Sequence, residues 1–305
     1  MDEAKTGIAT SDILSIFLCH NGRLHLNDEN RLFEFCKEQG IKVHVIDIDN
    51  LAQDLFLYFP KLASDYLAIE IDSGQILSLA DFLSEYHKNP FSTRLDTAFF
   101  SRDKELEDVL ALIESHDIVI LSGEPGVGKS RLAIEALTKF HNSNSDWTVY
   151  CLFNKQGISF YNDLKDYLGF DGNYLVFVDD ANRVSELQHL LRLIHDNSAT
   201  RNIRIVLTVR EYAQRSVLEI TKGYDNSSFA LKPFEKDKLR SFISAEFGIT
   251  NVHFLERIES VAKGNARIAV MAATIAKKTD RYESLLNVED IYDHYFESVE
   301  AGDWN

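Results

Sequence analysis

The chain has 305 residues, 45% of them hydrophobic and 26% charged, which is typical of a globular protein and argues against a disordered one. Its formal net charge of -16 argues against a general basic surface for nucleic acid, although a local basic patch is left open. The three cysteines (Cys19, Cys36 and Cys151) have no metal-binding spacing, and no apolar run approaches the length of a membrane span, so we expect a cytoplasmic protein with reduced thiols.

The first block, residues 1–67, predicts a small α/β segment. Residues 1–12 are acidic and polar, unlike a signal or transit peptide. The hydrophobic pattern then predicts a strand, a helix, a strand and a helix in turn, at Ile13–Cys19, Asn27–Gly40, Ile41–Asp47 and Asp49–Phe59. This order predicts part of a parallel sheet, in a block too short to be a self-sufficient domain.

Residues 68–98 have a less regular pattern. One helix is expected at Leu79–Tyr86, and the polar, proline-containing stretch KNPFSTRLD follows it. We therefore expect a linker that packs on the segment after it.

Residues 99–234 alternate between apolar strands and amphipathic helices. The expected strands are Asp117–Ser122, Thr148–Phe153, Tyr174–Asp179, Ile203–Val209 and Phe229–Leu231. The expected helices are Asp103–Glu114, Lys129–Phe140, Phe160–Leu168 and Val184–His195. This alternation predicts an α/β core with a doubly wound parallel sheet. Residues 235–305 predict only helices, which we interpret as a lid, at Lys236–Phe247, Val252–Lys263, Ala266–Lys277 and Val288–Glu297.

A glycine-rich turn after the first core strand fits the pattern GxxxxGK[ST] completely. Its glycines allow backbone N–H groups to surround a phosphate, and the helix after it directs its positive end toward the same group. Lys129 is expected to reach the β- and γ-phosphates of a nucleotide, and Ser130 to ligate Mg²⁺. The predicted nucleotide-binding residues are Gly123, Glu124, Pro125, Gly126, Val127, Gly128, Lys129, Ser130 and Arg131.

Two acids, Asp179 and Asp180, follow the apolar strand LVFV. The carboxyl end of a parallel strand meets its neighbours at one edge of the sheet, so we expect both acids beside the glycine-rich turn. We assign Asp179 to Mg²⁺ and Asp180 to the catalytic general base that polarises an attacking water.

Arg210 follows the next strand, IVLTV, where an arginine is expected to reach a γ-phosphate in a catalytic role. Arg183 is a second candidate for that role. The spacing of the strands resembles the P-loop class in which a sensor strand is inserted between the P-loop strand and the acid strand. No NKxD-like reader of guanine is found, so ATP is the expected nucleotide.

Several segments together resemble the STAND ATPases, signal-transduction ATPases that include apoptotic, plant-resistance and bacterial antiphage proteins. The segments are FFSRDKEL before the P-loop, VFVDDANR and VLTVREYA at the acid and sensor strands, and FALKPF with AKGNAR at the join of core and lid. The resemblance implies an ATP-dependent switch in bacterial defence or signalling, which forms homo-oligomers when a protein trigger activates it. It makes Arg102 and Arg267 candidates to bridge lid and phosphate. The family has proline where this chain has Ala266, near the adenine.

The first block resembles the last strands and helices of a restriction-endonuclease-like (Mrr-type) nuclease domain, through IFLCHN and IKVHVIDIDNLAQDL. The catalytic Asp…Glu-x-Lys set of such nucleases would lie upstream of Ile13, where there is no room for it. We therefore expect no nuclease activity from this chain, and either a degenerate effector segment or a fragment of a longer nuclease–STAND protein. Two alternatives to an ATP-hydrolysing switch stay open: a non-hydrolysing, nucleotide-gated scaffold and a DNA-acting ATPase.

Overall fold

The computed structural model describes residues 13–22, 25–57, 59–69, 72–88, 95, 99–155, 158–194, 200–279 and 287–300. The acidic N-terminal stretch and most of the proline-containing stretch of the expected linker lie outside the described residues. The chain divides into two compact units, residues 1–73 with 156–159 and residues 74–155 with 160–305, and each is described by itself.

The first unit is built on two parallel strands. β1 (Ser15–Cys19) pairs in parallel with β2 (Lys42–Ile46), and α2 (Leu26–Glu38) lies between them in the chain, as the sequence predicted. α3 (Ile48–Leu57) follows as expected, and α4 (Pro60–Leu67) is an additional helix. Its proline lies in the first turn, where a missing N–H costs no hydrogen bond.

The described part of the first unit buries little apolar surface. Its hydrophobic cluster centres on three buried residues, Cys36, Ile41 and Val43. In contrast, Leu14 is 82% exposed and Phe17 is 65% exposed. A two-stranded sheet with so small a core contributes little stability of its own.

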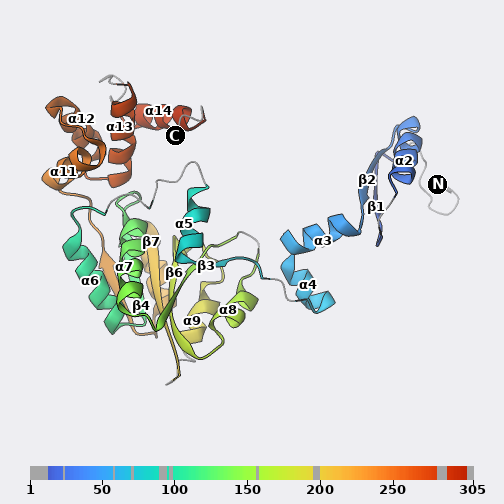
Figure 1. The fold of residues 1–305 in the computed structure, drawn as a ribbon, viewed down its shortest axis with the longest axis horizontal. Coiled ribbons are helices and arrows are strands. Elements are labelled where there is room, and N and C mark those ends of the chain that lie inside the picture. Colours follow the sequence, from blue (N-terminus) through green and yellow to red (C-terminus); the bar gives the residue numbers. More distant parts are fainter. Residues whose placement is uncertain are drawn as a thin grey trace. The chain divides into compact units, whose positions relative to one another are not determined.

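The second unit contains one six-stranded sheet (Figure 1). Its strands are β3 (Ile76–Ser78), β4 (Ile118–Gly123), β5 (Trp147–Leu152), β6 (Gly172–Val178), β7 (Arg201–Arg210) and β8 (Asn226–Ala230). They lie in the order β3-β5-β6-β7-β4-β8, and every pair is parallel except β3–β5. The predicted α/β class with a doubly wound sheet is confirmed, and β7 lies between β4 and β6 as the strand spacing indicated.

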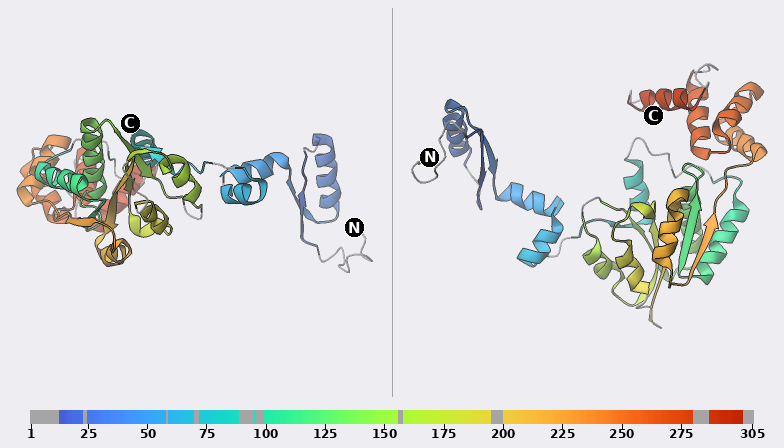
Figure 2. Two further views of the ribbon diagram at one scale, coloured as in Figure 1. Left: turned by 90° about the horizontal axis from the view of Figure 1, so that it is seen from below. Right: turned by 180° about the vertical axis from the view of Figure 1, so that it is seen from behind.

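Helices cover both faces of this sheet (Figure 2). One face packs against α5 (Leu79–His87), α6 (Asp103–Ser115) and α7 (Lys129–Ser143), and the other against α8 (Tyr161–Leu168), α9 (Leu187–Ile194) and α10 (Gln214–Thr221). Neighbouring residues of β4 show why the sheet needs helices on both faces. Ile118 and Ile120 belong to one hydrophobic cluster and Val119 and Leu121 to the other, because side chains alternate along a strand.

The C-terminal helices of this unit pack on each other around a core of their own. They are α11 (Lys236–Phe247), α12 (Val252–Ala262), α13 (Ala266–Thr279) and α14 (Val288–Glu300). Leu239, Ile258, Met271 and Ile291 are fully buried in this cluster. The helical segment predicted after the core is therefore present, and we call these four helices the lid.

Three features of the second unit differ from the sequence prediction. β3 lies within the expected linker and joins the sheet, although a three-residue strand is too short to show a period of two. The helix expected at Val184–His195 begins at Leu187, because a turn of 3₁₀-helix at Ala181–Arg183 comes first; His195 itself is outside the described residues. α10 was not predicted.

Across the described ranges, none of the helices combines the length and the apolar character needed to cross a bilayer.

Candidate functional site

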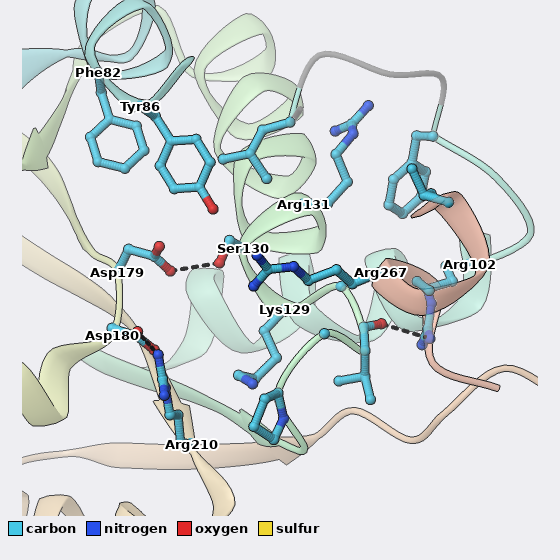
Figure 3. A pocket seen from close by; sticks show the side chains of 18 of the residues that line it. Phe82, Tyr86, Arg102, Lys129, Ser130, Arg131, Asp179, Asp180, Arg210 and Arg267 are labelled. Carbon is cyan, nitrogen blue, oxygen red and sulfur yellow. Dashed lines mark hydrogen bonds and ion pairs between the residues drawn. The ribbon is translucent and has the colours of Figure 1, made fainter. Parts of the chain in front are cut away.

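A cavity of about 650 Å³ lies where β4, β6 and β7 end and α7 begins (Figure 3). Its walls come from α5, from the segment before α6, from the glycine-rich loop, from the acid and sensor strands and from the start of α13. Parallel strands bring their carboxyl ends together at such an edge, which is where open α/β sheets bind ligands. The second unit thus builds this cavity from segments far apart in the sequence.

The glycine-rich loop connects β4 to α7, and its glycines are structurally required. Gly126 has φ of +83°, and a Cβ there would lie 2.5 Å from the Asn265 Oδ1 atom of the lid. Gly128 precedes α7 with φ of +100°, in the left-handed region that favours glycine. The loop therefore turns tightly and lets the lid approach its backbone.

Lys129 is held inside the glycine-rich loop. Its Nζ atom donates hydrogen bonds to the carbonyls of Gly123 and Glu124, each at 2.9 Å. Burial lowers the pKa of the ammonium, while the carboxylates of Asp180 and Asp179 act in the opposite direction. A cation that is 7% exposed and bonded only to neutral carbonyls is well prepared to receive an anion.

Asp179 accepts two hydrogen bonds at the end of β6. Ser130 Oγ donates to its Oδ1 atom at 2.7 Å, and Thr208 Oγ1 donates to the same atom at 2.6 Å. Burial raises the pKa of this carboxyl, although both hydrogen bonds oppose the increase. The hydroxyl and carboxylate oxygens side by side are the hard ligands that Mg²⁺ prefers, so Ser130 and Asp179 fit that ion.

Asp180 has a different environment from its neighbour. Arg210 donates to it through Nη2 at 2.8 Å and Nε at 3.3 Å, and the Arg183 Nε atom lies 3.7 Å from its Oδ2 atom. Its backbone is in the left-handed conformation with φ of +48°, and its N–H donates to Thr208 Oγ1 at 2.8 Å. The hydrogen bond with Asp180 raises the pKa of Arg210, so the guanidinium stays charged where it contacts Asp180.

The lid contacts the glycine-rich loop directly. The Arg267 N–H donates to the Gly126 carbonyl at 3.0 Å, and Asn265 Nδ2 donates to the Pro125 carbonyl at 2.8 Å. Asn265 Oδ1 also accepts from the N–H groups of Arg267 and Ile268, and thereby caps α13. The Arg267 side chain extends into the cavity (Figure 3).

Arg102, also expected to bridge lid and phosphate, lines the cavity. Its Nη2 atom donates to the carbonyls of Val127 and Lys232 at 3.1 and 3.0 Å, and its guanidinium lies 4.0 Å from the centre of the Phe234 ring. It is 5% exposed and forms an ion pair with Glu105. These contacts tie the glycine-rich loop to the segment between β8 and the lid.

Most of the predicted site residues line this one cavity. Those on its wall are Pro125, Gly126, Val127, Gly128, Lys129, Ser130, Arg131, Asp179, Asp180 and Arg210. Gly123 and Glu124 are not on the wall, and they contribute the two carbonyls that hold Lys129. Arg131 pairs with Glu135 at 2.9 Å and lies 5.4 Å from the Phe99 ring.

Sequence reasoning missed four residues at the site. Thr208 is the one polar residue in the buried run IVLTV, a signal that was available. Asn265 lies in the AKGNAR segment but was given no role. Phe82 and Tyr86 come from α5, and no sequence signal places them at the cavity because their position depends on β3 joining the sheet.

The sheet order, the glycine-rich loop on a helix N-terminus and the adjacent acids define a P-loop nucleoside triphosphatase core. Residues 100–240 match the family model described as novel STAND NTPase 3. This match covers the core and the first residues of α11, and it supports the STAND resemblance for that part of the chain. The family match lies outside the first block, so the resemblance of that block to an Mrr-type nuclease stays a prediction.

The chain is similar in fold to several solved structures. The Walker-type ATPase PABY2304 of Pyrococcus abyssi has a TM-score of 0.44 at 17% identity, over 67% of this chain and 73% of that chain. The Orc1 protein of Aeropyrum pernix in complex with DNA has a TM-score of 0.50 at 16% identity, over 68% of each chain. RuvB of Thermotoga maritima has a TM-score of 0.46 at 16% identity, over 65% of this chain and 70% of that chain. Among curated proteins, no sequence matches this chain.

Proposed function

We propose that this chain is an ATP-binding and ATP-hydrolysing molecular switch of the STAND type. One observation carries the proposal: Ser130, directly after Lys129 of the glycine-rich loop, lies 2.7 Å from the Asp179 carboxylate at the sheet edge. A nucleotide phosphate on the loop and a metal beside that carboxylate would be immediate neighbours. The family match over residues 100–240 supports the same class.

The cavity has room and chemistry for a nucleotide. The backbone N–H groups of the loop and Lys129 would hold the phosphates, and Ser130 and Asp179 would hold Mg²⁺. The bound metal would supply charge neutralisation for the phosphate oxygens. Aromatic and apolar side chains that also line the cavity are suited to the adenine: Phe99, Phe100, Phe234, Phe242, Ala266 and Val270.

Hydrolysis requires Asp180 to leave its partner. The Asp180 carboxylate oxygens accept hydrogen bonds from Arg210 in the structure, so they are not free to orient a water molecule. A γ-phosphate carries more negative charge than a carboxylate and competes for the same guanidinium. In the proposed cycle Arg210 turns to the γ-phosphate, and the released Asp180 orients and deprotonates the attacking water.

The contact between lid and loop supports the switch. Arg267 and Asn265 both bond carbonyls of the loop that would surround the phosphates, so the nucleotide state would change the position of the lid. In this proposal lid movement controls homo-oligomer formation in response to a protein trigger in the cytoplasm. Bacterial defence is the proposed setting, on the strength of the STAND resemblance and the family match.

Turnover of ATP by the full chain tests hydrolysis. We expect Asp180→Asn to lower turnover at least about 100-fold, because it removes the general base while ATP binding persists. Asp108→Asn, an exposed acid on α6, is the matched control and should turn over ATP like the wild type. A wild type without turnover above background would instead favour the non-hydrolysing scaffold, in which the Asp180–Arg210 pair stays closed.

A further inference from the structure

The segment before the P-loop core carries a side chain into the cavity described above. α5 and β3 precede residues 100–240, the part of the chain that matches the family model. Tyr86 of α5 nevertheless lines the same cavity as Ser130 and Asp179. Figure 3 shows its hydroxyl directed toward the space beside these two residues.

The position of α5 is fixed from both ends. β3 pairs with β5, and the fully buried Gln75 accepts from the Lys155 N–H through Oε1 at 2.7 Å. Ser78 Oγ caps α5 by accepting from the Asp81 N–H at 3.1 Å. After the helix, the Leu95 N–H donates to His87 Nε2 at 3.1 Å.

Phe82 secures the face of α5 that points to the sheet. Its ring is 2% exposed and packs edge-on against Phe177 of β6, with centroids 5.7 Å apart. It contacts Phe153 and Tyr86 in the same cluster, at 6.2 and 6.0 Å. Tyr86 is therefore carried by an element that is packed on the acid strand itself, and its ring direction does not depend on a flexible loop.

The chemistry of the Tyr86 hydroxyl suits an anionic oxygen. Burial raises the pKa of Tyr86 to about 12, and the carboxylates of Asp179 and Asp180 raise it as well, whereas Arg267 lowers it. The phenol is thus neutral near pH 7 and can donate a hydrogen bond. Asp179 and Asp180 would repel a phosphate, so donors are needed on this side of the cavity.

We propose that Tyr86 is a binding residue for the terminal phosphate of the nucleotide, supplied by α5 from outside the P-loop core. This rests on the proposed function. The assignment to the γ-phosphate follows from its neighbours, because Tyr86 faces the carboxylates expected at the metal and at the attacking water. The β-phosphate, in contrast, would lie within the glycine-rich loop. ADP would lack the group that Tyr86 contacts.

Tyr86→Phe in the full chain tests this inference, because it keeps the ring and removes only the hydroxyl. Calorimetric titration with the non-hydrolysable triphosphate adenylyl imidodiphosphate and with ADP, both with Mg²⁺, gives the two affinities. We expect about tenfold weaker binding of the triphosphate and unchanged binding of ADP. Tyr174→Phe is the matched control, since that hydroxyl donates to Phe170 and Asp171 carbonyls outside the cavity, and it should change neither affinity.

Unchanged binding of both nucleotides by a folded Tyr86→Phe variant would overturn the inference, and so would equal weakening of both. If the variant does not fold, hydrogen exchange of the wild type decides. Stronger protection of α5 amides by the triphosphate than by ADP supports the contact, and equal protection contradicts it. A wild type that binds neither nucleotide would overturn the proposed function as well, whereas wild-type binding with an unaffected variant overturns only this inference.

Discussion

At the scale of single residues, the two neighbouring acids at the end of β6 differ in what surrounds them. Asp179 is packed against hydroxyls, and burial raises the pKa of its carboxyl. Asp180 lies against the guanidinium groups of Arg210 and Arg183. The two carboxyl groups therefore have different environments. That of Asp179 suits a cation, and that of Asp180 pairs the proposed general base with arginine.

The Asp179 environment predicts an effect on stability. A carboxyl whose pKa is higher in the folded than in the unfolded chain binds protons more strongly when folded, so it lowers stability at pH values above both pKa values. Asp179→Asn should raise the free energy of unfolding of the nucleotide-free protein at pH 7, because it removes the cost of burying the charged carboxylate. The gain should shrink as the pH falls toward the range in which Asp179 is protonated.

Thermal unfolding from pH 7 down to pH 4 measures this gain. The same variant should lose the Mg²⁺-dependent part of ATP binding, because it removes a proposed metal ligand. An Asp179→Asn protein that is less stable than the wild type at pH 7 would contradict the assigned cost of the buried charge.

Some residues of the site could be predicted from the sequence, and others could not. Lys129, Ser130 and Asp179 were predictable because a motif and a strand end fix them locally, without knowledge of the whole fold. Tyr86 was not predictable, since its place depends on a short antiparallel strand joining the edge of a sheet. The pairing of Asp180 with Arg210 needed the register of β6 against β7.

At the scale of elements, α13 joins the lid to the glycine-rich loop through its first turn. Asn265 does two things there: it caps the helix through Oδ1 and it bonds the Pro125 carbonyl through Nδ2. Gly264 before it has φ of +85°, and a Cβ would lie 2.5 Å from the Phe234 carbonyl oxygen. The segment GNAR thus forms a sharp turn and then the start of α13, and Asn265 holds this start close to the glycine-rich loop.

The two roles of Asn265 can be separated by mutation. Asn265→Ala should lower the free energy of unfolding by about 1 kcal/mol, because the cap is lost. Asn265→Ser should recover most of this stability, since serine is also a good cap but is too short to reach Pro125. Thermal unfolding compares the two, and a serine variant no more stable than the alanine variant would contradict the capping role.

Elements with a strong period were predicted well and short or irregular ones were not. The strands of the core are buried on both faces, so they appear in the sequence as continuous apolar runs such as IVIL and LVFV. Helices α11 to α13 begin within a residue of their predicted starts because caps and glycines mark their ends. α10 follows a turn of 3₁₀-helix directly and has only eight residues, too few for a clear pattern.

At the scale of the whole molecule, the second unit carries every residue of the proposed site. Its two sheet-facing clusters and the lid cluster contain most of the buried apolar side chains among the described residues. The first unit has the predicted parallel strand pair but little buried surface in its described part. A nucleotide-dependent change would begin at the sheet edge and reach the lid through Gly126 and Pro125.

The central claim is that the loop around Lys129 binds the phosphates of ATP, and equilibrium binding of ATP with Mg²⁺ tests it most directly. Lys129→Ala should weaken binding at least about 100-fold, roughly 3 kcal/mol, because it removes the buried ammonium from the phosphates. Lys139→Ala, an exposed lysine on the same helix, should bind like the wild type. A folded Lys129→Ala protein that still binds ATP with wild-type affinity would contradict the account.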